Sequence, residues 1–543
     1  MSTDDSGTRR RSTGWRTSAA VVSAAALALA PATTALAKPK APARPAAASN
    51  ACANANNNTY AKVLDCITVE GVREHQAALQ AVADANGGTR ASGTPGYTAS
   101  VDYVASTLRA AGWQVTLDPF DFTFVAEPTL SVGGVDVETG LFTGSGSGSL
   151  NAPVVAVDIN LTGNRASTSG CEASDFDGFP AGSIALVQRG TCDFGVKAQN
   201  AQDAGAIGVI LFNQGNTPER SGLLLGTLLP SGAAVTIPVI GASFEAGAAL
   251  AGKTASVTVP APVDMVINNV IAEKRGSNDG NVVMAGAHLD SVLAGPGIND
   301  NGSGSAALLE FAQTTRKLKP ENTIRLAFWG AEENGLLGST DYVETLSQAE
   351  RDRIALYLNF DMIGSPNHVF FVYDGDESSF DAPVVVPEGS VQIEDVFESF
   401  FTMRGVPYED SEFSGRSDYQ AFIEADIPSG GLFTGAEVPK TAEQAAIWGG
   451  TAGISYDPCY HIACDDYDNV NLTALDVNSD AVAYAILTYA YSTESVNGVK
   501  GKTVPGSPGP MVAPAGPEGT VGKLKAGGGG LAHDHLHDED IPA

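Results

Sequence analysis

The sequence is poor in positive charge and in long apolar runs. It carries 31 Lys and Arg residues against 62 Asp and Glu residues, for a formal net charge of −31 at pH 7. This excess argues against nucleic acid or an anionic membrane as partner and favours a soluble chain whose copies repel one another. The apolar run at residues 19–30 is too short to cross a bilayer, so no membrane span is expected. We expect the chain to act as a monomer.

Cysteine is also scarce, and no C-x-x-C pair is present. Six cysteines allow fifteen disulfide connectivities. Sequence proximity favours Cys52–Cys66, Cys171–Cys192 and Cys459–Cys464. Disulfides are the default in an exported chain, so free buried thiols are the weaker alternative.

Both ends of the chain read as segments outside the fold. Residues 1–37 have an Arg-rich start, a short apolar stretch and the small-x-small sequence Ala35-Leu36-Ala37, which is typical of a signal peptide and predicts secretion from a bacterial cell. Residues 38–50 form a Pro/Ala linker. The Gly/Pro-rich residues 498–543 predict a disordered tail, whose three histidines would bind metal only loosely.

The amino-acid composition and the hydrophobic pattern of the chain change twice between these ends. Residues 51–128 and 263–497 have mixed α/β patterning, with helices expected at 68–86 and 100–111 and a strand at 115–124. Residues 129–262 are rich in Gly, Ala and Val, form short strands and have almost no acid–base side chains. With 43% hydrophobic residues over 543 positions, more than one domain is expected.

The middle segment resembles a protease-associated (PA) domain. The resemblance rests on the strand leading into Arg189-Gly190-Thr191-Cys192-Asp193-Phe194, the Ala-rich helix at 196–205 and the strand at 206–213. A lid or partner-binding insert and an appendage that serves stability alone are equally good interpretations of this segment.

Residues 282–333 carry most of the ionisable chemistry. An apolar strand at 282–285 delivers His288 and Asp290, a Gly/Asn loop presents Asp300, and a helix is expected at 302–318. A second strand at 323–328 then ends at Glu332 and Glu333. This order is typical of a βαβ unit, in which the strand ends point side chains into one crevice.

Two further residues join this group by their position. Asp361 ends the apolar strand 354–360, and His461 lies in a constrained loop, whereas His75 and His368 are expected to be ordinary surface residues. Buried carboxylates without a nearby Lys or Arg need a positive partner, and two His with three carboxylates suit a pair of zinc ions. Helix capping or loop solvation would explain one such acid but not five converging residues.

The complete motif set resembles the di-zinc peptidases of family M28, in particular secreted bacterial leucine-type aminopeptidases. The motifs are HLDSV, GINDNGSG, WGAEENGLLGS, NFDMIG and YHIACD. The resemblance covers residues 70–128 and 263–491, with the PA domain between them. It implies a three-layer α/β/α sandwich with a mixed, mostly parallel sheet (the zinc exopeptidase fold), interrupted by a β-rich PA domain.

The resemblance also implies individual roles. His288 and Asp361 would hold one zinc ion, Glu333 and His461 the other, and Asp300 both, while Asp290 would orient His288. Glu332 would be the general base and Tyr460 would stabilise the oxyanion. Arg416 would help to position substrate, unless it forms a surface salt bridge, and Phe433 would line the pocket for the N-terminal side chain. Relatives of this type also carry a structural calcium, whose ligands are not recognisable in the sequence.

The predicted function is therefore removal of apolar, leucine-like residues from the N-termini of peptides and proteins. A carboxypeptidase is the nearest alternative, because the same metal core serves both activities, although Arg416 alone is thin support for binding a substrate carboxylate. A glutaminyl cyclase is weaker, because such relatives use one zinc ion. A non-catalytic PA-domain receptor is the alternative from another class, and in those relatives the ligand set is broken.

Overall fold

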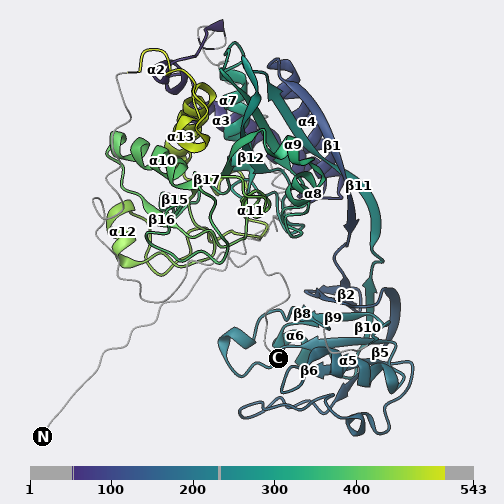
Figure 1. Ribbon diagram of the computed structural model, residues 1–543. Helices are drawn as coiled ribbons and strands as arrows, with labels where there is room; N and C mark the ends of the chain where they lie inside the picture. The colour runs from purple at the N-terminus through teal and green to yellow at the C-terminus, as the bar shows by residue number, and fades with distance from the viewer. Residues whose placement is uncertain (1–51, 53, 230–233, 508–543) are drawn as a thin grey trace, which may run out of the picture. The chain divides into compact units, whose positions relative to one another are not determined.

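A computed structural model describes residues 52, 54–229 and 234–507 of the chain (Figure 1). The predicted signal peptide, the linker and the tail from residue 508 onward lie outside the described residues. Three disulfide bonds join Cys52 to Cys66, Cys171 to Cys192 and Cys459 to Cys464, which confirms the pairing favoured by sequence proximity. No helix among the described residues combines the length and the apolar character that a bilayer span requires.

The first sheet has eight strands in the order β1-β11-β13-β12-β14-β17-β15-β16. Its four parallel pairings include the central β13/β12, β12/β14 and β14/β17, and its three antiparallel pairings lie towards the edges. The strands are β1 (Gln114–Phe124), β11 (Val263–Lys274), β12 (Asn278–His288), β13 (Asn322–Trp329), β14 (Ile354–Phe360), β15 (Phe371–Tyr373), β16 (Glu409–Ser411) and β17 (Ser429–Phe433).

Helices cover both faces of this sheet, because its central strands are apolar on both sides. On β12, Val283 and Ala285 belong to one core cluster and Met284 to the other. Helices α3, α4, α7, α10 and α13 contribute to the first cluster, and α8 and α11 to the second. The predicted α/β/α layering and mixed sheet are therefore confirmed. The helices are α2 (Tyr60–Leu64), α3 (Val69–Ala85), α4 (Pro95–Ala110), α7 (Gly302–Thr314), α8 (Leu337–Thr345), α9 (Gln348–Arg351), α10 (Ser390–Arg404), α11 (Tyr419–Glu424), α12 (Ala442–Trp448), α13 (Leu472–Tyr491) and α14 (Glu494–Asn497).

Local sequence signals explain where the helices begin. The hydroxyl of Thr68 caps α3 by accepting a hydrogen bond from Gly71 N, and Thr94 does the same for α4, which opens on Pro95. The expected helix at 100–111 therefore starts five residues earlier than its apolar periodicity suggests. Helix α7 starts at Gly302 as expected but ends at Thr314, four residues before the predicted end.

The second sheet is formed by residues 129–259 and has nine strands in the order β3-β2-β10-β5-β6-β7-β9-β4-β8. Strands β6 and β7 are buried along their whole length, and α5 and α6 pack against opposite faces of the sheet. The elements are β2 (Thr129–Val132), β3 (Val135–Val137), β4 (Gly140–Thr143), β5 (Gly148–Val157), β6 (Ile184–Gln188), α5 (Phe194–Asp203), β7 (Gly208–Phe212), β8 (Gly226–Thr227), β9 (Val239–Ala242), α6 (Phe244–Leu250), β10 (Thr254–Val259) and two short 3-10 turns, Ala173–Phe176 and Pro218–Arg220.

Candidate metal centre

The central parallel strands end at one edge of the first sheet and place the predicted residues there. In the register of the sheet, His288 on β12 lies opposite Trp329 on β13, and Gly286 lies opposite Asn359 on β14. His288 is the last residue of β12, and Asp361 follows β14 directly. Glu332 and Glu333 follow β13 after a tight turn at Ala331. The strand ends therefore converge, as the βαβ pattern predicts.

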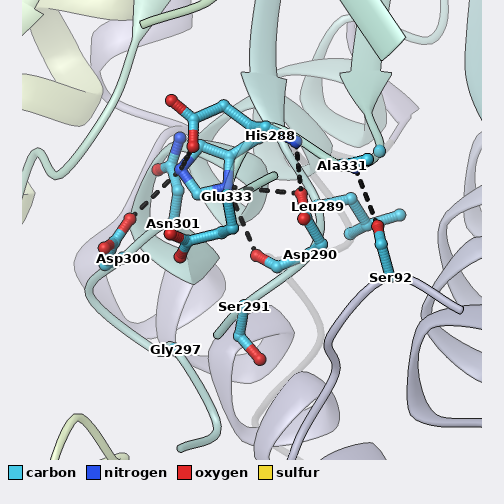
Figure 2. A network of polar contacts seen from close by, with 12 residues as sticks. Ser92, His288, Leu289, Asp290, Ser291, Gly297, Asp300, Asn301, Ala331 and Glu333 are labelled. Atoms are coloured by element: carbon cyan, nitrogen blue, oxygen red, sulfur yellow. Dashed lines mark hydrogen bonds and ion pairs between the residues drawn. The ribbon is translucent and has the colours of Figure 1, made fainter. Parts of the chain in front are cut away.

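Asp300 lies between the two imidazoles (Figure 2 shows its approach to His288). Its Oδ1 atom is 3.1 Å from His288 Nε2, and its Oδ2 atom is 3.1 Å from His461 Nε2. Asp361 Oδ1 is also 3.1 Å from His288 Nε2, and Glu333 Oε2 is 2.9 Å from His461 Nε2. Two groups of donors, one around each histidine, thus share Asp300.

These separations fit metal coordination. Two ligand atoms about 2.05 Å from a tetrahedral zinc ion lie roughly 3.3 Å apart, close to the spacings around each histidine. Asp290 Oδ2 and Glu333 Oε1 are buried and accept no hydrogen bond from any described residue. Buried carboxylate oxygens of this kind need a positive partner. His288, Asp361 and Asp300 can therefore hold one ion, and His461, Glu333 and Asp300 a second.

Glu332 stands slightly apart from these ligands. Its Oε2 atom is 3.9 Å from His288 Nε2, farther than either Asp300 or Asp361. Burial raises the pKa of Glu332 well above its usual range, against the lowering effect of His288, and the charges of Asp361 and Asp418 raise it further. Its backbone amide donates to Asp290 Oδ1 at 3.3 Å, which fixes the turn.

The same electrostatics act on the histidines and the shared acid. Burial alone would lower the pKa of His288, but Asp361, Glu332 and the hydrogen bonds to Asp290 and Asp300 raise it well above its usual range. The pKa of His461 rises to about 11, because Glu333 and Asp300 outweigh burial. Burial would raise the pKa of Asp300, yet hydrogen bonds to both histidines hold it below its usual range. The carboxylates thus stabilise positive charge at the position of both imidazoles.

Strained backbone supports three of the site segments. Ala331, Met362 and His461 are not glycines, yet they have φ values of 53°, 49° and 58°. Left-handed conformations of such residues persist where surrounding structure enforces them, and they cluster at functional sites. Here they occur before Glu332, after Asp361 and at His461 itself, whose loop is closed by the Cys459–Cys464 disulfide.

The remaining predicted residues lie around this centre. Asp290 faces His288 Nδ1, with Oδ1 at 3.6 Å and its backbone oxygen at 3.3 Å, so it can orient that ring. Tyr460 stacks on His461 with ring centroids 3.8 Å apart, and burial, followed by the charges of Asp300 and Glu333, raises its pKa well above the usual range. Their roles in catalysis remain predictions.

Arg416 and Phe433 differ in their surroundings. Arg416 Nη1 forms an ion pair with Glu437 Oε1 at 3.3 Å, as the salt-bridge alternative predicts, although the Arg416 side chain is only 11% exposed. Phe433 is buried and packs against Phe371 with ring centroids 6.0 Å apart. Contact of either residue with substrate remains a prediction.

The surface interpretation of two histidines is wrong. His75 is buried, and its Nδ1 atom lies 2.6 Å from the hydroxyl of Tyr103. His368 is also buried, and Lys440 donates a hydrogen bond to its backbone oxygen. Burial lowers the pKa of each ring to about 4, with Lys440 adding to the effect at His368. Both are therefore neutral, buried residues. The polar residues next to them in the sequence gave no indication of this burial.

Three residues that support the centre were missed by sequence reasoning. The guanidinium of Arg90 is fully buried and donates to the backbone oxygens of Leu289, Pro296 and Gly297, which joins the segments around Asp290 and Asp300. Ser417 Oγ donates to Asp361 Oδ2 at 2.7 Å, and Asp465 accepts hydrogen bonds from the amides of Asn299 and Asp300. Asp465 ends the motif YHIACD and Ser417 follows Arg416, but no sequence signal marks Arg90, and all three contacts depend on tertiary structure.

Comparisons with known proteins identify the families that this sequence matches. Peptidase family M28 matches residues 269–486, and the PA domain family matches residues 150–250. An aminopeptidase from Pseudomonas aeruginosa is 48% identical over 452 residues, covering 80% of this chain and 83% of that protein. Leucine aminopeptidase 2 from Trichophyton equinum is 42% identical over 425 residues, covering 76% of this chain and 82% of the fungal protein.

A solved structure has a similar fold. BSAP, a zinc aminopeptidase from Bacillus subtilis, has a TM-score of 0.57 and 28% identity, covering 77% of this chain and 94% of its own. Identity of 48% over four fifths of the chain is enough to assign the family. The chain belongs to peptidase family M28 and carries a PA domain within its sequence.

Proposed function

We propose that this M28 peptidase is a secreted aminopeptidase that uses two zinc ions to remove leucine-like residues from peptide N-termini. The observation that carries the proposal is the position of Asp300, whose two carboxylate oxygens lie 3.1 Å from the two imidazole nitrogens. One carboxylate between two such donor groups suits a pair of ions sharing a ligand. The aminopeptidase relatives and the zinc aminopeptidase of similar fold support the same reaction.

His288, Asp361 and Asp300 would hold the first zinc ion, and His461, Glu333 and Asp300 the second. When bound, zinc lowers the pKa of water and polarises the carbonyl of the scissile peptide bond. Asp290 would keep the His288 proton on Nδ1, which leaves Nε2 as a ligand atom. Side chains of the protein would then transfer the protons and stabilise the negative charge that develops during the reaction.

Glu332 would act as the general base. Its carboxylate takes the proton from the attacking water and later delivers that proton to the leaving amine, so it ends the cycle ionised as it began. Tyr460, which is stacked on His461, would donate its hydroxyl hydrogen to the oxyanion of the tetrahedral intermediate. The acids around the centre would attract the substrate's free ammonium group, and Phe433 would form part of an apolar wall for the first side chain.

The ion pair of Arg416 favours this reaction over carboxypeptidase activity. A carboxypeptidase needs a cation for the substrate carboxylate, whereas Arg416 is already in an ion pair with Glu437. The non-catalytic alternative is also weaker, because the five predicted metal ligands and Glu332 are all present and lie close together. Secretion is supported by the predicted signal peptide and the three disulfide bonds.

The test uses leucyl-p-nitroanilide beside an N-acetylated peptide with a free C-terminus, together with zinc analysis of the purified chain. We expect turnover of the free-amine substrate only, its loss with a chelator and its return on addition of zinc, at two ions per chain. Cleavage of a blocked peptide from its C-terminus would establish the carboxypeptidase instead. Two bound zinc ions without turnover of either substrate would favour a binding protein.

A further inference from the structure

A second group of buried acids comes from helix α10 and the edge strand β16 of the first sheet. None of these acids belongs to the candidate metal centre. Glu394 and Glu398 are one turn apart on α10, and Asp410 is on the edge strand β16. All three are buried, with exposed fractions of 4%, 6% and 4%. Asp374 and Asp376, from the loop after β15, also have carboxylate oxygens close to Glu394. We call the first three residues the outer acid cluster.

The spacing within the outer acid cluster is that of ligands to one ion. Carboxylate oxygens of Glu394, Glu398 and Asp410 all lie within 4.8 Å of one another. Calcium binds oxygen at about 2.4 Å, so two ligands of one calcium ion are separated by at most roughly 4.8 Å. Asp374, Asp376 and Glu394 satisfy the same limit, which makes Glu394 common to both groups.

Asp410 provides an independent indication of a missing positive partner. Its Oδ1 atom is buried and accepts no hydrogen bond from any described residue, while Oδ2 accepts one from Ser379 Oγ. In the part of the chain that the structure describes, no Lys or Arg forms an ion pair with any member of the outer acid cluster. An ionised, buried carboxylate in such surroundings is costly without a cation.

Glu394 is held in place for such a role. Its Oε2 atom accepts hydrogen bonds from the amides of Gly375 and Asp376, both at 3.0 Å. This fixes the carboxylate against the loop after β15, while Oε1 can face the neighbouring acids. Asp374 fixes the same loop by accepting from the amides of Ser378, Ser379 and Phe380.

We propose that Glu394, Glu398 and Asp410 bind a calcium ion, with the loop at Asp374 and Asp376 closing one side. All donors are oxygen atoms, which suits a hard cation and not zinc, whose usual ligands include nitrogen or sulfur. Three carboxylates, some bidentate, together with water supply the six to eight oxygens that calcium takes. The ion joins α10, the loop after β15 and the edge strand β16, so its role is structural.

Protons compete with calcium for these oxygens. Burial, and then the surrounding acids, raise the pKa of Glu394 to about 10, that of Glu398 to about 7 and that of Asp410 to about 6. The groups that act on them are Asp374 and Asp376 from the loop, Asp395 on α10, and Tyr408 and Glu409 beside β16. Calcium affinity should therefore fall as the pH decreases from 8 to 5.

The sign for stability without calcium is the opposite. Between the unfolded pKa values near 4 and the raised folded values, the folded chain binds more protons than the unfolded chain. The stability of calcium-free protein should therefore decrease as the pH rises through this window. Calcium should reverse that decrease, so the rise in Tm on adding calcium should be larger at pH 8 than at pH 5.

The experiment measures 45Ca²⁺ binding by equilibrium dialysis on the full chain, loaded with two zinc ions so that the catalytic site is filled, with Mg²⁺ as competitor. Wild type and the control Glu388→Gln, an exposed acid before α10, should bind one calcium ion per chain, and calcium should raise the Tm of both. Asp410→Asn and Glu398→Gln should each raise the Kd for calcium at least tenfold. Far-UV circular dichroism and a cooperative thermal transition without calcium show whether each variant is folded.

Each alternative outcome would overturn the proposal. No bound calcium and no change in wild-type Tm up to about 10 mM, beyond the affinity range of extracellular calcium modules, would mean that these acids share protons instead. Equal calcium binding by wild type and both variants would place the ion elsewhere. If Asp410→Asn does not fold, Glu398→Gln alone decides the question. Failure of the aminopeptidase proposal would leave these results unaffected, because calcium binding is measured without substrate.

Discussion

The two sheets of this chain have similar parallel centres but opposite chemistry at their strand ends. In the peptidase sheet, β12 and β14 deliver His288 and Asp361 into a group of charged residues. In the PA sheet, β6 ends at Gln188, which is fully buried. Gln188 Oε1 accepts from Asn160 N at 2.7 Å, and its Nε2 donates to the backbone oxygens of Asn160 and Gln214.

The two strand ends differ in whether their buried polar atoms have hydrogen-bond partners. The amide of Gln188 is neutral, and main-chain groups of its own domain satisfy it. The carboxylates of Asp290 and Glu333 retain buried oxygens without a hydrogen bond from any described residue. In residues 129–229 and 234–262, no three His, Cys, Asp or Glu side chains lie close enough to share an ion. Parallel strands thus end in neutral, hydrogen-bonded groups in one sheet and in the charged residues of the candidate metal centre in the other, so the site and not the sheet indicates the function.

The largest expected effect comes from Glu332→Gln. This change keeps the size of the side chain but removes its basicity, so turnover should fall about 10²- to 10⁴-fold. Because Glu332 lies farther from His288 Nε2 than Asp300 and Asp361 do, zinc content should remain at two ions. Kinetics and metal analysis on the same sample test this.

The matched control is Glu344→Gln, an exposed residue on α8, which should behave as wild type. If Glu332→Gln loses zinc together with activity, Glu332 is a ligand and the assignment of the base is incorrect.

A smaller effect is expected from Ser417→Ala. Ser417 Oγ donates to Asp361 Oδ2 at 2.7 Å and accepts from Asn359 Nδ2 at 2.8 Å, so it orients a predicted ligand. Loss of such a contact typically weakens metal affinity about 10- to 100-fold. Titration with a competing chelator measures this, and saturating zinc should restore much of the activity. The control Ser414→Ala, from the same loop, should leave zinc affinity unchanged; a similar loss there would indicate damage to the loop as a whole.

The sequence was sufficient to predict the features that depend on local pattern. Strand β14 occupies residues 354–360 as expected, and His288, Asp300 and His461 lie together as the motifs imply. Periodicity and strand ends specify these, because parallel strands place their carboxyl ends at one edge.

Tertiary contacts explain what could not be predicted. Arg90 lies about two hundred positions from the oxygens it binds, and nothing near it in sequence indicates burial. Asp410 likewise joins the acids of α10 because the edge strand β16 pairs with β15, and no local sequence pattern predicts this pairing. His75 sits on a helix with regular periodicity, yet its own position faces inward towards Tyr103.

Two of the three disulfides provide a direct comparison of the PA domain and the candidate metal centre. Replacing Cys171 and Cys192 by Ser opens a loop of 21 residues in the PA domain, at a cost of about 3 kcal/mol in that domain's free energy of unfolding. Replacing Cys459 and Cys464 opens a loop of 5 residues, at a cost of about 2 kcal/mol. Because the second loop holds His461, only that variant should lose kcat/KM, several-fold and with weaker zinc affinity. Equal losses of kcat/KM in both variants would show that the PA domain contributes to catalysis.

The smallest effect on activity, and the sharpest test of the comparison, is expected from Gln188→Leu. The substitution leaves the backbone groups of Asn160 and Gln214 without their side-chain partner, which should cost about 1–3 kcal/mol in the stability of the PA domain. Because Gln188 contributes hydrogen bonds only within residues 129–262, kcat/KM for leucyl-p-nitroanilide should remain at the wild-type value. Urea unfolding monitored alongside activity measures both quantities. A stable variant with reduced kcat/KM would mean that the end of β6 contributes to the reaction on substrate. A neutral side chain with all its hydrogen bonds made would then not mark a strand end as inactive.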